Sequence, residues 1–266
     1  SRGETSGVFQ FESDGMRQLL RDFQPESIAH LTLLNAMYRP GPMQYIQTVV
    51  RRRQGKESIS WPHPDLEPIL RETYGIMAYQ EQIMAVAHQF AGMSLGQADM
   101  LRRAVAKKKQ SIIDAERQSF IQGAVKKGYD AELAEKIYSD IEKFANYGFN
   151  KSHSCAYATV AYQTAYLKVH YPTEYMASLL TSVMGKYKNV KLGEYLQVCR
   201  DMGIEVLPPD VNTSEATFVP RKDHRIVFGL TAVKNVGENA VKAIIEERKK
   251  RPFSSFYDFC TRVRLG

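Results

Sequence analysis

The sequence predicts a mainly α-helical protein: a multi-helix domain, then a small β element, then a further helical unit. Apolar residues recur every three or four positions from about residue 15 to residue 203, which is the period of amphipathic helices. Two short runs, 204–210 and 225–228, instead combine extended-chain residues with turn signals. We therefore expect a helical domain over 1–203, a β-containing connector over 204–228 and the start of a further helical unit over 229–266.

Glycine, proline and serine mark the ends of the expected helices. These helices cover about 76–93, 110–127, 131–147, 153–170, 173–184 and 187–202. Gly128, Gly148 and Gly203 follow three of them, at the position where a helix end favours a left-handed residue. Pro172 lies in the first turn of another, and Ser94 follows Gly92 as a candidate N-cap.

Composition limits the kinds of partner. The 266 residues include 36 Lys and Arg against 29 Asp and Glu, and the net charge of +7 favours phosphate-rich partners through counterion release. The three cysteines lie far apart and form no CxxC pair or disulfide framework, which indicates a reduced, cytoplasmic protein. No apolar run approaches the roughly 18 to 20 residues of a membrane span, and no signal peptide begins the chain, so we expect no membrane partner.

The segment 98–109 carries the densest positive charge. It places five cations in eight positions of an expected helix: Arg102, Arg103, Lys107, Lys108 and Lys109. Arginine binds phosphate bidentately and lysine acts as a mobile point charge, so the mixture suits a triphosphate or a nucleic-acid backbone. Acidic neighbours are few, with only Asp99 and Asp114 flanking the run. The alternative interpretation is a solvated helix face.

A second polar run, 146–154, contains Asn150, Lys151, Ser152 and His153 after Gly148. A helix that starts at Ser152 would offer free backbone donors and the positive end of its dipole to an anion. The side chains of Lys151 and His153 would add donors to the same anion. A helix-capping or core histidine is the alternative for His153.

Two prolines around Gly41 predict a rigid turn after a helix, which fixes the direction of Arg39. The functional interpretation is an arginine aimed at the same anion. The alternative is an exposed arginine at a simple helix-to-helix corner.

The segment 230–245 has the pattern of a helix-hairpin-helix unit, with its tight turn at Lys234, Asn235, Val236 and Gly237. The backbone amides of such a hairpin bind a DNA phosphate without reading the base sequence. Asn235 stands where a glycine is usual, which is feasible because Asn tolerates a positive φ better than most residues. We expect these four residues, together with Lys108 and Lys109, to contact DNA.

Several other sites are excluded by their residues. Gly55-Lys56 lacks the glycine and the hydroxyl of a P-loop, since Val50 and Glu57 occupy those positions. No histidine has a metal-ligand partner at helical spacing. The clustered carboxylates of two-metal phosphoryl transfer are also missing, because no Asp-x-Asp pair occurs in the sequence.

Taken in order, these motifs closely resemble the fingers domain of the C-family replicative DNA polymerases of bacteria. The matching segments are 6–13, Tyr38-Arg39-Pro40-Gly41-Pro42, 74–82, 98–109, Tyr147-Gly148-Phe149-Asn150-Lys151-Ser152-His153-Ser154 and 207–210, followed by the hairpin loop. The resemblance implies a fingers domain followed by the start of a helix-hairpin-helix domain. It also implies a DNA-directed DNA polymerase as the parent, with primer-template DNA, a deoxynucleoside triphosphate and the other polymerase domains as partners.

The resemblance further implies that Arg102 and Arg103 reach the triphosphate of the incoming nucleotide and that the run from Asn150 to His153 flanks the same pocket. In this family the catalytic Mg²⁺ is held by palm carboxylates, and the sliding clamp is bound through regions outside this chain. The missing initiator Met at Ser1 agrees with a segment of a longer polypeptide. We therefore expect no cofactor on this segment and no catalysis by it alone. The alternative is a non-enzymatic helical DNA-binding module.

Overall fold

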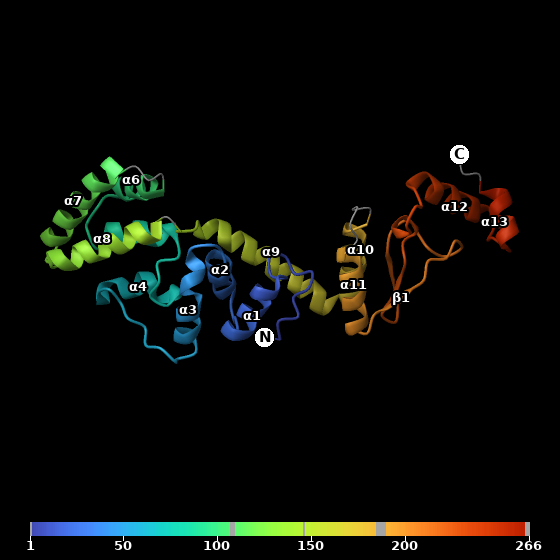
Figure 1. Ribbon diagram of the computed structural model, residues 1–266, viewed down its shortest axis with the longest axis horizontal. Helices are drawn as coiled ribbons and strands as arrows, with labels where there is room; N and C mark the ends of the chain where they lie inside the picture. The colour runs from blue at the N-terminus through green and yellow to red at the C-terminus, as the bar shows by residue number, and fades with distance from the viewer. Residues whose placement is uncertain (1, 107–109, 146, 185–189, 264–266) are drawn as a thin grey trace. The chain divides into compact units, whose positions relative to one another are not determined.

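The computed structural model describes residues 2–106, 110–145, 147–184 and 190–263 (Figure 1). Its contacts divide the chain into two compact units. The first unit comprises residues 1–4 and 13–162, and the second comprises residues 5–12 and 163–266. The mainly α fold class is confirmed, with one small three-stranded sheet among the described residues.

Helices build the first unit. They are α1 (Asp14–Phe23), α2 (Ile28–Met37), α3 (Ile46–Arg53), α4 (Glu67–Leu70), α5 (Gln80–Gln89), α6 (Leu95–Ala106), α7 (Gln110–Lys126) and α8 (Ala131–Ala145). Short 3-10 turns cover Pro42–Tyr45, Pro64–Leu66 and Arg71–Thr73. Helix α9 (Lys151–His170) begins in the first unit and ends in the second.

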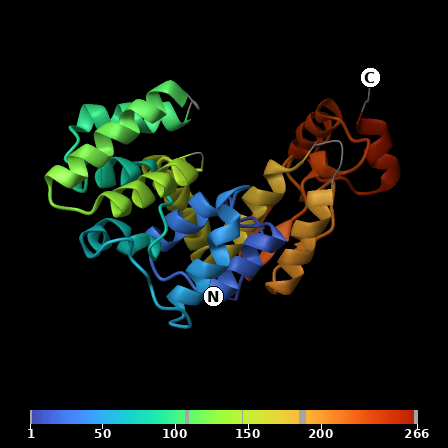
Figure 2. The same ribbon diagram turned by 60° about the vertical axis from the view of Figure 1, so that its left-hand side comes forward.

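Helices α5 to α8 pack around one apolar cluster, in which Phe120 and Tyr138 are fully buried. Figures 1 and 2 show α6, α7 and α8 as neighbouring helices. The Tyr138 hydroxyl donates to the Ile113 carbonyl over 2.7 Å, so its buried polar group is satisfied. Gly123 on α7 permits a close approach, because a Cβ there would lie 2.0 Å from the Ala91 carbonyl oxygen. The cluster holds α6, with its cations, against its neighbours.

The predicted helix ends are confirmed at several positions. Gly92, Gly128 and Gly203 all take positive φ values, of 66°, 91° and 71°. The same prediction for Gly148 was wrong, because α8 already ends at Ala145 and Gly148 has no positive φ. The Ser94 hydroxyl accepts a hydrogen bond from the Gln97 amide, and the Gln97 side chain accepts one from the Ser94 amide. Helix α6 therefore starts with a reciprocal cap.

One predicted helix start was wrong. The periodicity from residue 76 predicts a helix there, whereas α5 begins at Gln80. Residues 76–79 are not helical, because the extended Tyr79 pairs with Phe149 in an isolated parallel bridge. A tertiary contact thus overrides the local apolar pattern.

The second unit contains the remaining elements. They are α10 (Pro172–Ser182), α11 (Val190–Asp201), β1 (Glu205–Leu207), β2 (Val219–Arg221), β3 (Arg225–Val227), the 3-10 turn Leu230–Ala232, α12 (Glu238–Lys250) and α13 (Phe256–Arg262). Pro172 is in the first turn of α10, as predicted.

The amino-terminal loop 5–12 packs within the second unit through Glu12. This carboxylate accepts hydrogen bonds from the Gly7 amide, from the Tyr195 hydroxyl on α11 and from Lys191. Burial alone would raise the pKa of Glu12, but these hydrogen bonds outweigh burial and the pKa is lowered. A charged Glu12 therefore ties the loop to α11.

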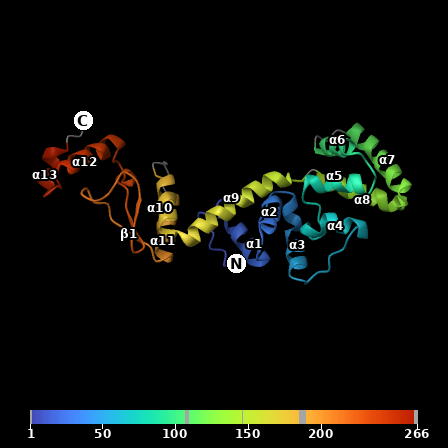
Figure 3. The same ribbon diagram turned by 180° about the vertical axis from the view of Figure 1, so that it is seen from behind.

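The sheet has the strand order β1-β3-β2, with β1 parallel and β2 antiparallel to β3. Figure 3 shows β1 beside α11. The extended runs at 204–210 and 225–228 are confirmed as β1 and β3. Strand β2 was not predicted because Pro220 lies at its centre. Proline is tolerated there because β2 is an edge strand.

In the described part of the chain, no helix combines the length and the apolar character that crossing a membrane requires.

Candidate functional site

The polar residues 79–82 at the start of α5 meet the predicted polar run 147–154. The Phe149 amide donates to the Ala78 carbonyl over 3.0 Å, and the Gln80 amide donates to the Phe149 carbonyl over 3.0 Å. The buried Gln82 amide holds the extended segment from the other side, since its oxygen accepts from the Ala78 and Tyr79 amides. The polar cluster 79–82 and the run 147–154 are therefore neighbours in space.

The side chain of Gln80 connects this meeting point to α6. Its Oε1 accepts a hydrogen bond from Arg102 Nη1 over 2.9 Å, and its Nε2 donates to the Gly148 carbonyl over 3.2 Å. Gly148 leaves room for this side chain, because a Cβ at residue 148 would lie 3.3 Å from Gln80 Cγ. Arg102 and the run 147–154 thus belong to one hydrogen-bonded cluster.

Both predicted arginines of α6 bind one carboxylate, that of Asp99. Arg102 Nε and Nη2 donate to Asp99 Oδ1 over 2.9 and 2.7 Å, and Arg103 Nε lies 2.7 Å from Oδ2. The hydrogen bond from Arg102 is the main cause of a lowered pKa for Asp99. The Arg103 side chain is 66% exposed and that of Arg102 only 25%, so Arg103 presents more of its guanidinium to solvent. Lys107, Lys108 and Lys109 lie outside the described residues.

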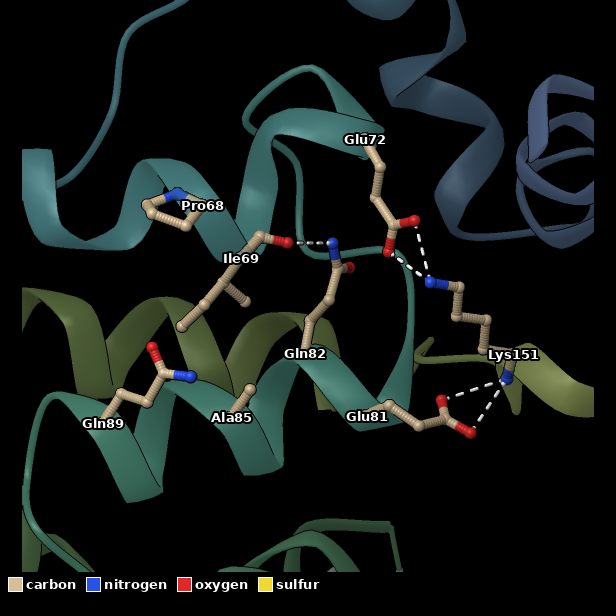
Figure 4. A pocket seen from close by; sticks show the side chains of 8 residues that line it. All are labelled: Pro68, Ile69, Glu72, Glu81, Gln82, Ala85, Gln89 and Lys151. Carbon is tan, nitrogen blue, oxygen red and sulfur yellow. Dashed lines mark hydrogen bonds and ion pairs between the residues drawn. The ribbon is translucent and has the colours of Figure 1, made fainter. Parts of the chain in front are cut away.

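The expectation of free backbone donors at the start of α9 was wrong (Figure 4). Helix α9 begins at Lys151, one residue before the predicted start, and the Lys151 amide donates to both oxygens of the Glu81 carboxylate over 3.1 and 3.0 Å. Asn150 Oδ1 accepts from the His153 amide over 2.8 Å, and Asn150 Nδ2 donates to Glu81. The positive end of the helix dipole therefore already has a protein anion.

Lys151 also has protein partners for its ammonium group. Its Nζ donates to both Glu72 carboxylate oxygens over 2.7 Å and lies 5.5 Å from the centre of the Tyr79 ring. Figure 4 shows Lys151 and Glu72 on the wall of a pocket of about 300 Å³, whose other lining residues include Ile69 and Gln89. Lys151 thus lies in the same segment as the hydrogen-bonded cluster around Gln80, but its positive charge is neutralised by Glu72.

The next residues of α9 are exposed to solvent. Ser152 and His153 are both exposed. The His153 imidazole lies 4.4 Å from the Tyr157 ring and 5.4 Å from the Phe149 ring, between centroids. These contacts orient the imidazole along the helix and leave it accessible.

Arg39 reaches the same segment but is held by protein groups. Its Nε donates to the Ala36 carbonyl and its Nη2 to the Tyr147 carbonyl, both over 2.9 Å. The guanidinium also lies 4.2 Å from the centre of the Phe149 ring, and burial lowers the pKa of Arg39. The predicted rigid turn is confirmed, since Gly41 has a φ of 100°. The turn directs Arg39 toward residues 147–149, where its Nη2 donates to the Tyr147 carbonyl.

The hairpin loop of the second unit has the predicted backbone. Asn235 takes a positive φ of 65°, which confirms that it replaces the usual glycine. Lys234, Asn235 and Gly237 are exposed, and Val236 is half-buried with its amide donating to the Val233 carbonyl over 3.1 Å. Gly237 is the N-cap residue of α12, and no side chain caps this helix. The loop therefore presents an open helix N-terminus beside Lys234.

Contacts of the residues on both sides of this loop hold it in place within the second unit. The Leu230 amide donates to the Glu215 carbonyl over 2.9 Å, and Gly229 allows the approach, because a Cβ there would lie 2.6 Å from the Thr217 carbonyl carbon. Leu230, Val241 and Ile244 are buried in one apolar cluster. The turn and the first turns of α12 are thus one rigid piece.

Sequence reasoning missed the roles of Asp99, Glu81 and Gln80. Asp99 precedes the two arginines by three and four residues, and this spacing was the signal for its ion pairs. No comparable local signal linked Glu81 or Gln80 to residues 148–151. Among the described residues, no three His, Cys, Asp or Glu side chains gather where they could hold a metal ion.

Comparison with known proteins gives consistent matches along the chain. Residues 1–128 match the family model of the bacterial DNA polymerase III alpha subunit finger domain, and residues 203–266 match that of the helix-hairpin-helix motif. The chain is 47% identical over 263 residues to the DNA polymerase III subunit alpha of Bacillus subtilis, and 49% identical over 269 residues to that of Thermus aquaticus. Each alignment covers 99% of this chain, but only 23% and 22% of the relative. The chain thus spans about a quarter of the length of these relatives.

Proposed function

We propose that the chain is a segment of a bacterial DNA polymerase III α subunit and serves as the finger and helix-hairpin-helix part of a DNA-directed DNA polymerase. The support is the match of residues 1–128 and 203–266 to those two family models and the 47% identity to the Bacillus subtilis subunit. In this proposal the segment binds the triphosphate of the incoming deoxynucleotide and the backbone of the DNA. The carboxylates that hold the catalytic Mg²⁺ come from elsewhere in the polymerase. The isolated segment is therefore expected to be catalytically inactive.

The observation that carries the nucleotide assignment is the adjacent arginine pair on α6. Asp99 neutralises one charge of the pair and orients both side chains, while the Arg103 side chain remains 66% exposed. We assign the main phosphate contact to Arg103 and a supporting one to Arg102, and Lys107 follows them in sequence. Such positioned cations align the α-phosphorus and neutralise the charge that develops during phosphoryl transfer.

The run at the start of α9 contributes less than its residue types suggest. Asn150 and Lys151 are engaged with Glu81 and Glu72, so they stabilise the site and bind no phosphate directly in this arrangement. Ser152 and His153 remain exposed on the first turn of α9. We propose these two as the nucleotide-facing groups of the run, and Arg39 as a residue that shapes the segment behind them.

The hairpin loop is proposed to bind the DNA backbone. Lys234 and the open end of α12 at Gly237 offer one cation and the partial positive charge of a helix N-terminus. Such contacts go to phosphates and carry no base-sequence information. Binding through this loop should therefore weaken steeply with added salt and be insensitive to sequence.

The first test is truncation of the exposed arginine, Arg103→Ala. Charge-assisted hydrogen bonds contribute about 1.5 to 3 kcal/mol, so we expect the dissociation constant for dATP to rise at least about tenfold. The measurement is isothermal titration of the chain with dATP, alongside fluorescence anisotropy with a DNA duplex. Arg71→Ala is the matched control, because Arg71 is an exposed arginine of the same unit whose side chain pairs with Glu67, four residues before it. Unchanged dATP binding by Arg103→Ala would remove the assignment.

A second candidate, a non-enzymatic DNA-binding module, is favoured by the open end of α12 alone. It predicts that the Arg103 change weakens duplex binding and leaves dATP binding unaltered. A salt titration of duplex binding by both variants separates the two functions, because loss of a phosphate-contacting arginine lowers the salt slope.

A further inference from the structure

One amide side chain, that of Gln80, touches both parts of the proposed nucleotide site. It lies at the first residue of α5, between the arginine pair of α6 and the segment 147–149. Its backbone amide is bound as well, to the Phe149 carbonyl. Three hydrogen bonds therefore fix one residue in relation to two elements that are far apart in sequence.

The chemistry of its neighbours fixes the orientation of the Gln80 amide. A guanidinium can only donate hydrogen bonds, so Arg102 must face the Gln80 oxygen. A carbonyl can only accept, so Gly148 must face the Gln80 nitrogen. The opposite orientation would place donor against donor and acceptor against acceptor. Gln80 is thus a directional link, which a side chain with only donors or only acceptors would not reproduce.

The consequence falls on Arg102. Its guanidinium is held on one edge by Asp99, through Nε and Nη2, and by Gln80 through Nη1. Without Gln80, rotation about the Asp99 contact would be less restricted, and Asp99 would also be less well placed for Arg103. A guanidinium that is already oriented loses less conformational freedom when it binds a phosphate, so fixing Arg102 in advance strengthens phosphate binding.

We infer that Gln80 is a positioning residue of the nucleotide site, which couples the arginine pair of α6 to the segment that leads into α9. It contacts no phosphate itself. This inference rests on the proposed function for its effect on nucleotide binding. The fixing of Arg102 follows from the hydrogen bonds alone and can be measured without any ligand.

The test compares Gln80→Leu, which removes both hydrogen bonds at similar size, with Gln80→Glu, which keeps an acceptor for Arg102. Gln89→Leu is the control, because Gln89 is an exposed glutamine on the same helix. The ligand-free readout is hydrogen exchange of the Arg102 Nε–H in nitrogen-15 NMR spectra. We expect exchange at least about fivefold faster in Gln80→Leu, and exchange close to that of the unaltered chain in Gln80→Glu and Gln89→Leu.

The ligand readout is titration with dATP. We expect Gln80→Leu to raise the dissociation constant about three- to tenfold at an unchanged melting temperature, whereas a merely structural glutamine would lower the melting temperature instead. Unchanged Arg102 exchange in Gln80→Leu, or an equal change in Gln89→Leu, would overturn the inference. If the unaltered chain binds no dATP, the proposed function fails, and the Arg102 exchange still decides whether Gln80 fixes this arginine.

Discussion

Helices α9 and α12 begin after similar polar runs, yet their N-termini differ in whether a protein carboxylate already binds the backbone amides that a phosphate would use. At α9 the Lys151 amide donates to the Glu81 carboxylate, and the Asn150 side chain accepts from the His153 amide in the same first turn. At α12 the N-cap is Gly237, and no side chain caps the helix. Both helices have the same dipole physics. The difference shows that a helix end is an anion site only when the fold leaves it without an anion of its own.

This difference assigns the two kinds of phosphate contact to two kinds of group. In the first unit the helix end is closed, so the proposed triphosphate site depends on the exposed guanidinium of Arg103. In the second unit the helix end is open, so the proposed DNA contact depends on backbone amides near Gly237. This assignment can be tested by adding a carboxylate at the N-terminus of α12 and by removing the one at the N-terminus of α9.

The largest effect is expected from Gly237→Asp, which gives α12 the carboxylate that α9 already has. A Cβ at Gly237 meets no atom within 4 Å, so the side chain fits. The new cap should hold or raise the melting temperature, while its charge repels a DNA phosphate and weakens duplex binding about tenfold or more. Fluorescence anisotropy with a duplex at fixed salt measures the loss.

Gly193→Asp is the control for this change. Gly193 is exposed in the same unit, a Cβ there also meets no atom within 4 Å, and the net charge changes equally. Equal weakening by both variants would mean that charge alone, and not the open helix end, governs DNA binding.

A smaller effect is expected from Glu81→Ala, which opens the end of α9. Loss of a helix cap costs about 1 kcal/mol, so the melting temperature should fall by a few degrees. The freed Lys151 amide should then respond to inorganic phosphate, which an NMR titration of its amide signal detects. Glu132→Ala is the control, since Glu132 is exposed on α8. If the Lys151 amide signal of Glu81→Ala did not respond to phosphate, Glu81 would not be what keeps anions from the N-terminus of α9.

The smallest effect concerns Asp99 and pH. The pKa of Asp99 is lowered in the folded chain, so its pairing with Arg102 and Arg103 stabilises the fold fully above the unfolded value of about 3.9. That contribution disappears as the pH falls through the lower, folded pKa. The Arg102 Nε–H signal should therefore be constant from pH 7 to about pH 4 and change only below that. In Asp99→Asn the signal should already differ at pH 7 and lack the acid-dependent step.

The sequence predicted features that depend on a few neighbouring residues. The positive φ of Asn235, the glycines that end helices and the Ser94 cap all follow from local stereochemistry. The ion pairs of Asp99 with the arginine pair are local as well, within one turn of α6, and could have been predicted from their spacing although they were missed. These were accessible because residues three or four apart on a helix are neighbours.

The sequence could not predict the closure of α9, since Glu81 lies 70 residues before Lys151. The same holds for the start of α5, which is set by the bridge between Tyr79 and Phe149, and for Gln80, whose partners come from two other segments. Residue types identified the run from Asn150 to His153 as polar and basic. Only the fold shows that carboxylates neutralise its first half.

The most direct test of the account is a crossed measurement on Arg103→Ala and Gly237→Asp, with dATP affinity and duplex affinity determined for both variants. We predict that Arg103→Ala loses dATP affinity and retains duplex affinity, and that Gly237→Asp loses duplex affinity and retains dATP affinity. If each variant weakened both ligands to the same extent, the chain would have one shared phosphate-binding surface, and the assignment of separate nucleotide and DNA sites would be wrong.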